Sequence, residues 1–259
     1  MSAIVVGGSS GMGKAAAVEV ARRGGNVLLC GRDEGRLAQA KTEVEAGAGS
    51  DGGPVMVATV DVTCDASMQK LFAERVSPDA YDALIFTAAS KAPHGAFLDL
   101  PPETTRAFLE SKLWGAFRCA RAAAPLLKEG GVIVVTTGVL GRRPGLNCTP
   151  LALANGALEA LVRNLALELG PRLRVNAFSP GFVATERFDH MDPARRDAML
   201  ASTAASLPLQ RVGQPADAGE ALYFLASNGY ATGITLDCDG GHLIRQYASA
   251  AGDPMRTEK

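Results

Sequence analysis

The chain has 259 residues, of which 47% are hydrophobic, and it carries 26 Lys and Arg against 27 Asp and Glu. This length and composition are typical of one globular domain with a substantial core. Because positive charge is not in excess, the balance does not favour nucleic acid or an anionic membrane as a partner, and a small-molecule substrate is expected instead.

The sequence shows no signal for secretion or membrane insertion. It opens on a strand-like run at residues 3–6, and it contains no apolar stretch of 18 residues. The five cysteines are widely spaced without a Cys-x-x-Cys pair, which is typical of a reducing compartment. The three histidines form no ligand-spaced cluster, so we predict a cytoplasmic protein without a metal site.

Short β-branched runs alternate along the chain with longer segments rich in Ala and Leu. The runs predict strands at residues 3–6, 26–30, 55–60, 83–87, 132–137, 174–178 and 234–238. Between them, apolar spacing near 3.6 predicts helices at residues 13–23, 34–46, 66–76, 102–127, 152–169 and 215–226.

This alternation predicts a single α/β domain of the doubly wound Rossmann type, with a parallel sheet of about seven strands. We expect the domain to span residues 1–248 and residues 249–259 to form a flexible tail. A Gly-rich stretch at residues 47–54 is expected to be a loop inside the domain.

The first motif with chemical meaning follows the first predicted strand and precedes an Ala-rich helix. Glycines there allow a tight turn and a close approach to a pyrophosphate, which amide N–H groups at the helix N-terminus can bind. The alternative is a glycine-rich turn without a ligand. The predicted cofactor-binding residues of this turn are Gly7, Ser9, Ser10, Gly11, Met12 and Gly13.

A second cofactor-reading position lies at the end of the next predicted strand, where Arg32 stands. An acidic residue there would bind a ribose 2′-hydroxyl, whereas a guanidinium suits a 2′-phosphate, so NADP(H) is favoured over NAD(H). Alternatively, Arg32 is an ordinary solvated charge. Asp61 and Val62 close the third strand and are candidates for binding adenine, although Asp61 could instead cap the following helix.

Taken together, these blocks resemble the classical short-chain dehydrogenase/reductase family over about residues 3–243. The similarity rests on the glycine turn, with Val6 in the place of the family's Thr, and on Arg174-Val175-Asn176, Ser179-Pro180-Gly181, Thr232-Gly233 and Asp239-Gly240-Gly241. The resemblance implies a mobile substrate lid at about residues 182–207 and backbone contact with the cofactor at Ala88. It also implies that the nicotinamide end is lined by Pro180, Gly181, Val183 and Thr185.

The four catalytic positions of that family are all substituted here. The family Ser falls on Gly138, the Tyr on Leu151, the Lys on Asn155, and the Asn of the preceding long helix on Lys112. In the family, Tyr transfers the proton, Ser orients the carbonyl, and Lys binds the ribose and lowers the Tyr pKa. Neither Leu151 nor Gly138 has a side chain that can transfer a proton.

Two of these changes form an exchange, since the family Asn becomes Lys112 and the family Lys becomes Asn155. We therefore take Lys112 and Asn155 as candidate catalytic residues. The alternative is that Lys112 points to solvent or an interface and Asn155 is incidental. Other candidate donors are Thr136, Thr137, Asn147, Cys148, Thr149, Ser90, Lys91 and His94.

Two classes of function remain open from the sequence. One is an NADP(H)-dependent oxidoreductase of non-standard mechanism, reducing a carbonyl, quinone or enone. The other is an inactive NADP(H)-binding protein that acts as a sensor or structural subunit. The resemblance also implies a homodimer or homotetramer formed through the two long helices. Trp114, Phe117 and Leu158 are candidates for its interface or for the core.

Overall fold

The computed structural model describes residues 1–244, which form one α/β domain around a seven-stranded sheet. All strand pairs are parallel, and their order in the sheet is β3-β2-β1-β4-β5-β6-β7. The strands are β1 Ala3–Val6, β2 Val27–Gly31, β3 Val55–Thr59, β4 Ala83–Phe86, β5 Gly131–Thr136, β6 Leu173–Pro180 and β7 Thr235–Cys238. This confirms the predicted doubly wound architecture.

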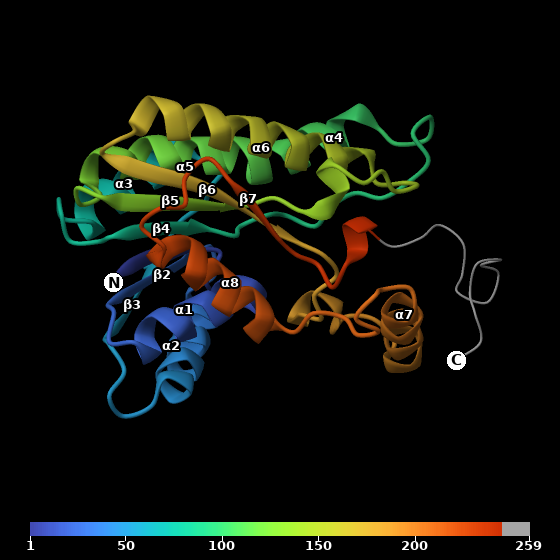
Figure 1. Cartoon of the computed structure of the whole chain (residues 1–259), viewed down its shortest axis with the longest axis horizontal. Coiled ribbons are helices and arrows are strands. Elements are labelled where there is room, and N and C mark those ends of the chain that lie inside the picture. Colours follow the sequence, from blue (N-terminus) through green and yellow to red (C-terminus); the bar gives the residue numbers. More distant parts are fainter. Residues whose placement is uncertain (245–259) are drawn as a thin grey trace.

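Helices cover both faces of the sheet, as Figure 1 shows. One layer contains α1 Gly11–Arg22, α2 Glu34–Ala48 and α8 Pro215–Ser227. The opposite layer contains α3 Asp65–Arg75, α4 Pro102–Leu109, α5 Gly115–Ala123 and α6 Thr149–Leu169. Each layer packs its own apolar cluster against the sheet, so the central strands are buried on both faces.

The order of strands places a switch point between β1 and β4. The chain runs outward from β1 through β2 to β3, then returns to β4 on the other side of β1. Val5 of β1 therefore pairs with Leu29 of β2 and with Ile85 of β4. In open parallel sheets, a ligand crevice forms at such a point, beyond the carboxyl ends of the strands.

The predicted helix at residues 102–127 is interrupted in the structure. After α4, a π-helical turn runs over Glu110–Trp114, and the chain then continues into α5 and a short 3-10 turn at Ala124–Leu126. The amide of Gly115 donates to the carbonyl of Glu110, five residues earlier. Such turns recur at functional sites because they re-aim side chains, and here the turn carries Lys112.

The segment at residues 182–207 contains a helix that the sequence analysis did not predict. It comprises a 3-10 turn at Glu186–Phe188 and α7 Pro193–Ala205, which Asp192 caps by accepting from the amide of Arg195 at 3.0 Å. None of the described residues of α7 is buried. Figure 1 shows α7 to one side of the sheet rather than against either face.

The predicted tail at residues 249–259 lies outside the described residues. Among the residues described, none of the helices combines the length and apolar content needed to cross a bilayer. Within the same part of the chain, we find no group of three or more His, Cys, Asp or Glu side chains placed to hold a metal ion.

Asn176 provides a test of how β6 is joined to the turn before β7. Its side chain is fully buried, donates to the carbonyl of Ala231 at 2.8 Å and accepts from the amide of Ile234 at 3.3 Å. We expect Asn176→Ala to lower the free energy of unfolding by about 2 kcal/mol, because both backbone groups lose their buried partner. Urea unfolding measures this change.

Asn164→Ala is the matched control for that experiment, because Asn164 is exposed on α6 and its side chain donates to the carbonyl of Ala160 in its own helix. Its effect should stay within about 0.5 kcal/mol. Equal destabilisation by the two variants would contradict the role assigned to Asn176.

Candidate active site

The glycine turn between β1 and α1 leaves room for the carboxyl end of β4. A Cβ built on Gly7 would lie 2.6 Å from the amide nitrogen of Ala88, and one on Gly13 would lie 2.4 Å from the carbonyl oxygen of Gly7. Thr87 holds this arrangement, because its hydroxyl lies 3.2 Å from the carbonyl oxygens of both Val6 and Gly7. The predicted residues Gly7, Gly13 and Ala88 are therefore brought together.

The N-terminus of α1 opens into the same place. Ser10 is its N-cap residue but makes no side-chain cap, and the first turn contains no acidic residue. Gly11 has a positive φ of 54°, which favours glycine. Unpaired amides at a helix N-terminus bind anions, so the residues present fit the diphosphate of a dinucleotide. Ser9 borders Gly31 at the end of β2, and Met12 is half-buried against the core.

The amide of Gly11 already has a partner that the sequence analysis missed. It donates to the Glu186 carboxylate at 2.8 Å, and Lys14 pairs with the same carboxylate at 2.6 Å. Burial alone would raise the pKa of Glu186, but the bonds from Lys14 and Gly11 outweigh it and hold the pKa below its usual value. In the sequence, the one indication of this contact was that Glu186, an acidic residue, follows Thr185, which the family resemblance places at the nicotinamide end.

At the end of β2, Arg32 is exposed. The carboxylate of the next residue, Asp33, is already engaged in a hydrogen bond. Asp33 caps α2 by accepting from the amide of Arg36 at 2.8 Å. Asp61 accepts from the amide and hydroxyl of Thr63, which together with Arg32 keep its pKa low. Cys64, not Asp61, is the N-cap of α3, and Val62 lies in the core.

The residues predicted to line the nicotinamide end of the cofactor lie at and just after the carboxyl end of β6. Pro180 is buried as the last residue of β6, and Gly181 packs so closely on Asp239 that a Cβ would lie 2.7 Å from its backbone. Val183 forms a bridge with Gly213. A Cβ on Gly11 would lie 3.2 Å from the side chain of Thr185, so this segment meets the glycine turn.

Lys112 points into the protein and not to solvent. It is 8% exposed, and its Nζ donates to the carbonyl of Thr137 at 2.9 Å, beside Gly138. Burial, and then the nearby positive charge of Arg187, lower the pKa of Lys112 to about 8. An ammonium has three N–H donors, so this bond leaves two for a ligand.

Asn155 fills the space that a side chain at residue 138 would need. It is 2% exposed, and its Nδ2 would lie 2.9 Å from a Cβ built on Gly138. Its Oδ1 and the Thr136 hydroxyl are buried and have no hydrogen-bond partner among the described residues. Lys112 and Asn155 therefore lie on neighbouring residues, Lys112 on Thr137 and Asn155 against Gly138.

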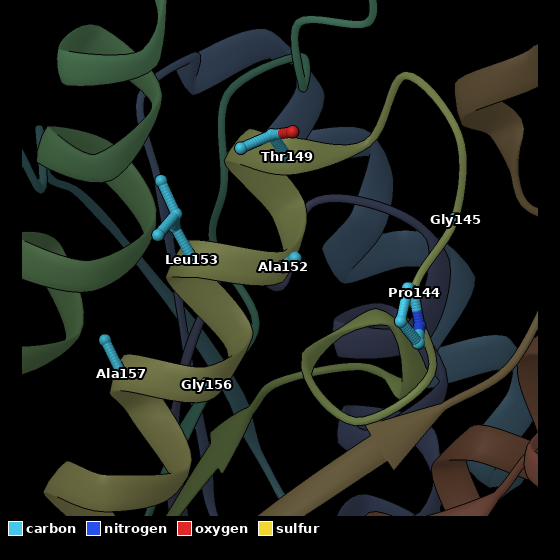
Figure 2. Close-up of a pocket in the computed structure, with 7 residues that line it drawn as sticks. All are labelled: Pro144, Gly145, Thr149, Ala152, Leu153, Gly156 and Ala157. Atoms are coloured by element: carbon cyan, nitrogen blue, oxygen red, sulfur yellow. The ribbon is translucent and has the colours of Figure 1, made fainter. Parts of the chain in front are cut away.

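Leu151 belongs to a small apolar cluster on the buried side of α6. The other members of this cluster are Ala92, Phe108, Leu109 and Ala154. The outward side of α6 borders a different hollow of about 560 Å³ (Figure 2). This hollow lies between Pro144 and the outward residues Ala152, Leu153, Gly156 and Ala157. It is therefore separate from the surroundings of Asn155.

The Arg142-Arg143 pair has internal partners. Arg142 binds Glu159 and Ser179 at 3.0 and 3.1 Å and pairs with Asp237, which joins α6, β6 and β7. Arg143 is buried and donates to the carbonyls of His242 and Leu243.

Three of the other candidate donors, His94, Ser90 and Thr137, have partners within the protein. His94 is exposed, with its Nδ1 3.7 Å from the sulfur of Cys148. Ser90 bonds the hydroxyl of Ser111 at 2.7 Å, and Thr137 bonds the carbonyl of Phe178 at 3.2 Å.

The family pattern described as enoyl-(acyl carrier protein) reductase matches residues 6–242. The chain belongs to the short-chain dehydrogenase/reductase family. The members of this family are NAD(P)-dependent oxidoreductases that act on small molecules.

Among curated relatives, an L-rhamnose 1-dehydrogenase (NAD(P)(+)) of Azotobacter vinelandii is 33% identical, covering 93% of this chain and 96% of the relative. A probable 2,4-dienoyl-CoA reductase of Bacillus subtilis is 32% identical, covering 94% and 97%. A crystal structure of a small-chain dehydrogenase in complex with NADPH superposes with a TM-score of 0.77 at 33% identity, covering 94% and 98%.

The fit between Gly138 and Asn155 can be tested by restoring the family's serine. Gly138 has a φ of 153°, which side chains rarely adopt, and a Cβ there meets Asn155. We expect Gly138→Ser to lower the free energy of unfolding by about 1–3 kcal/mol, as overpacking does. Urea unfolding measures this change.

Gly156→Ala, at the residue that follows Asn155 on the outward side of α6, is the control. A Cβ there comes no closer than 4.0 Å to the backbone of Gly141. This variant should gain up to about 1 kcal/mol of stability, because alanine favours the helix. A stable Gly138→Ser variant would show that residue 138 has room for a side chain.

Proposed function

We propose that this chain is an NADP(H)-dependent reductase of a small carbonyl, quinone or enone, with Lys112 and Asn155 in place of the family's usual catalytic residues. The observation that carries the proposal is the buried ammonium of Lys112 at the end of β5, held by the carbonyl of Thr137. A charged group that is buried without a carboxylate partner among the described residues is typical of functional sites.

The preference for NADP(H) is supported by the surroundings of Arg32. Arg32 is exposed at the end of β2, where family folds read the ribose. Asp33 would disfavour a 2′-phosphate if it faced the cofactor, but its carboxylate caps α2 instead. The guanidinium of Arg32 is thus the charged group available to a phosphate at this position, and it can bind one in bidentate fashion.

A bound nicotinamide cofactor supplies the hydride in reductions of this kind. The protein must then stabilise or protonate the substrate oxygen. Lys112 is suited to both tasks, because two of its N–H groups remain for a ligand and its pKa of about 8 lies near neutral pH. The amide of Asn155, buried against Gly138, is positioned to orient the same ligand.

The apolar surroundings of Leu151 support the substrate class. Leu151 stands in the place of the family's tyrosine and packs with Phe108, Ala92 and Ala154. An apolar side chain in the tyrosine's place suits a hydrophobic carbonyl, quinone or conjugated enone, whose oxygen gains negative charge on reduction. The similarity to a probable 2,4-dienoyl-CoA reductase is consistent with the enone class.

The proposal includes a lid at residues 182–207 and assembly into a homodimer or homotetramer. The absence of buried residues in α7 supports a lid that can move. Trp114 and Phe117 are 48% and 37% exposed and pack edge to face at 5.6 Å, which supports an interface on this side. Leu158 is fully buried in the core, which is one of the two places expected for it.

Cofactor choice is tested by reversing the charge of Arg32. We expect Arg32→Glu to weaken NADP+ binding about tenfold to a hundredfold, because a charge-assisted bond of about 1.5–3 kcal/mol is lost, while NAD+ binding is preserved. Titration calorimetry with both cofactors measures this. Arg36→Glu, an exposed reversal on the next helix, should leave both affinities unchanged. If Arg32→Glu leaves NADP+ binding intact, the assignment to NADP(H) is wrong.

The role of Lys112 is tested by the pH profile of turnover with 1,4-naphthoquinone and an enone panel. We expect kcat/KM for reduction to fall as the pH rises through about 8, because deprotonated Lys112 has no proton to give. Lys112→Met should lower kcat/KM about 10²–10⁴-fold, and Lys112→Arg should remove the pH dependence near 8. NADPH oxidation measures these rates.

Lys91→Met, which removes an exposed lysine from the loop after β4, is the control for charge alone and should retain the wild-type profile. Tight NADPH binding without oxidation across the panel would instead favour the cofactor-binding sensor. An unchanged profile in Lys112→Arg would remove Lys112 from the proton transfer.

A further inference from the structure

The Glu186 carboxylate occupies the most anion-attracting position of the glycine turn. It accepts the amide hydrogen of Gly11, the first residue of α1, at 2.8 Å. Its other oxygen pairs with Lys14 at 2.6 Å. A backbone N–H at a helix N-terminus together with an ammonium is the donor set that a phosphate would use.

We propose that Glu186 is an internal competitor of the cofactor diphosphate, a latch that binds Gly11 and Lys14 until the diphosphate displaces it. The inference rests on the proposed dinucleotide-binding function and extends it. It also assigns Lys14 as a further residue of the diphosphate site, exchanging one anionic partner for another.

The exchange is chemically matched. Glu186 stays ionised near neutral pH, because its bonds to Lys14 and Gly11 keep its pKa low despite burial. Burial lowers the pKa of Lys14, but its pairing with Glu186 and Glu43 more than compensates, so it stays protonated. The Glu186 carboxylate places one oxygen on a backbone amide and the other on an ammonium, as two oxygens of a diphosphate would. The amide hydrogen of Gly11 cannot be held by Glu186 and by a diphosphate at the same time.

The latch is connected to the lid. Glu186 opens the 3-10 turn Glu186–Phe188, and the ring of Phe188 stacks on Phe182 at 5.1 Å, so residues 182–188 form one packed unit. Beyond it, α7 has no buried residue, and a hollow of about 380 Å³ lies between that turn, α7 and the start of α8. Releasing Glu186 therefore frees a segment that few contacts hold.

The test compares two variants that each remove one negative charge from Lys14. Glu186→Gln opens the latch. Glu43→Gln removes the other partner of Lys14 but leaves the bond from Gly11 to Glu186 in place. We expect Glu186→Gln to tighten NADP+ binding about threefold to tenfold, because a latch closed in about 90% of molecules raises the apparent Kd about tenfold. Glu43→Gln should leave the Kd unchanged or raise it.

Adenosine 2′-monophosphate, which lacks the diphosphate, serves as the second ligand. Its Kd should be the same in the wild type and in Glu186→Gln. Equal tightening of both ligands, equal tightening in both variants, or no tightening in Glu186→Gln would each overturn the latch. If the wild type binds NAD+ and not NADP+, the same comparison is made with NAD+ and adenosine, which carries no phosphate, and only the cofactor choice is wrong.

A measurement without ligand separates the latch from the proposed function. Hydrogen exchange of the amides in residues 182–192 should be severalfold faster in Glu186→Gln than in the wild type and unchanged in Glu43→Gln. If exchange responds in this way but no dinucleotide binds either protein, Glu186 holds the segment but does not compete with a cofactor. Unchanged exchange in Glu186→Gln shows that the carboxylate does not hold the segment.

Discussion

The close approach of three backbone segments at the ends of β1 and β4 is the constraint on which the site depends. The turn at Gly7, the first turn of α1 at Gly13 and the strand end at Ala88 lie so near one another that a Cβ on either glycine would clash. The Thr87 hydroxyl secures this contact. As a result, the N-terminus of α1 opens at the switch point, where its Gly11 amide binds the Glu186 carboxylate and a larger anion would compete for the same donor.

The rest of the crevice shows how a substituted site stays well packed. Removing a side chain at residue 138 leaves space, and the amide of Asn155 takes it. Lys112 reaches the adjoining carbonyl of Thr137 from a different helix, through a π-helical turn that breaks α4 from α5. Because these residues touch one another, a change at one alters what the others can do, and a single reversion does not restore the family's arrangement.

Several expectations from the sequence needed the structure for correction. The 102–127 helix is divided because Gly115 bonds to a carbonyl five residues back, which apolar spacing does not reveal. The 182–207 segment, which the family resemblance predicts to be a mobile lid, contains the helix α7, none of whose residues is buried. Arg142 joins α6, β6 and β7, and Arg143 holds the chain near His242, and spacing along the sequence does not reveal these contacts between distant segments.

By itself, the sequence determined the fold, the parallel sheet and the position of the glycine turn. These depend on local periodicity and on residues that lack a side chain or a donor, which act over a few positions. Tertiary structure decided where Lys112 points and what Gly11 binds. Glu186 is 175 residues from Gly11, and the partner of a charged side chain depends on which distant elements meet, which local spacing cannot specify.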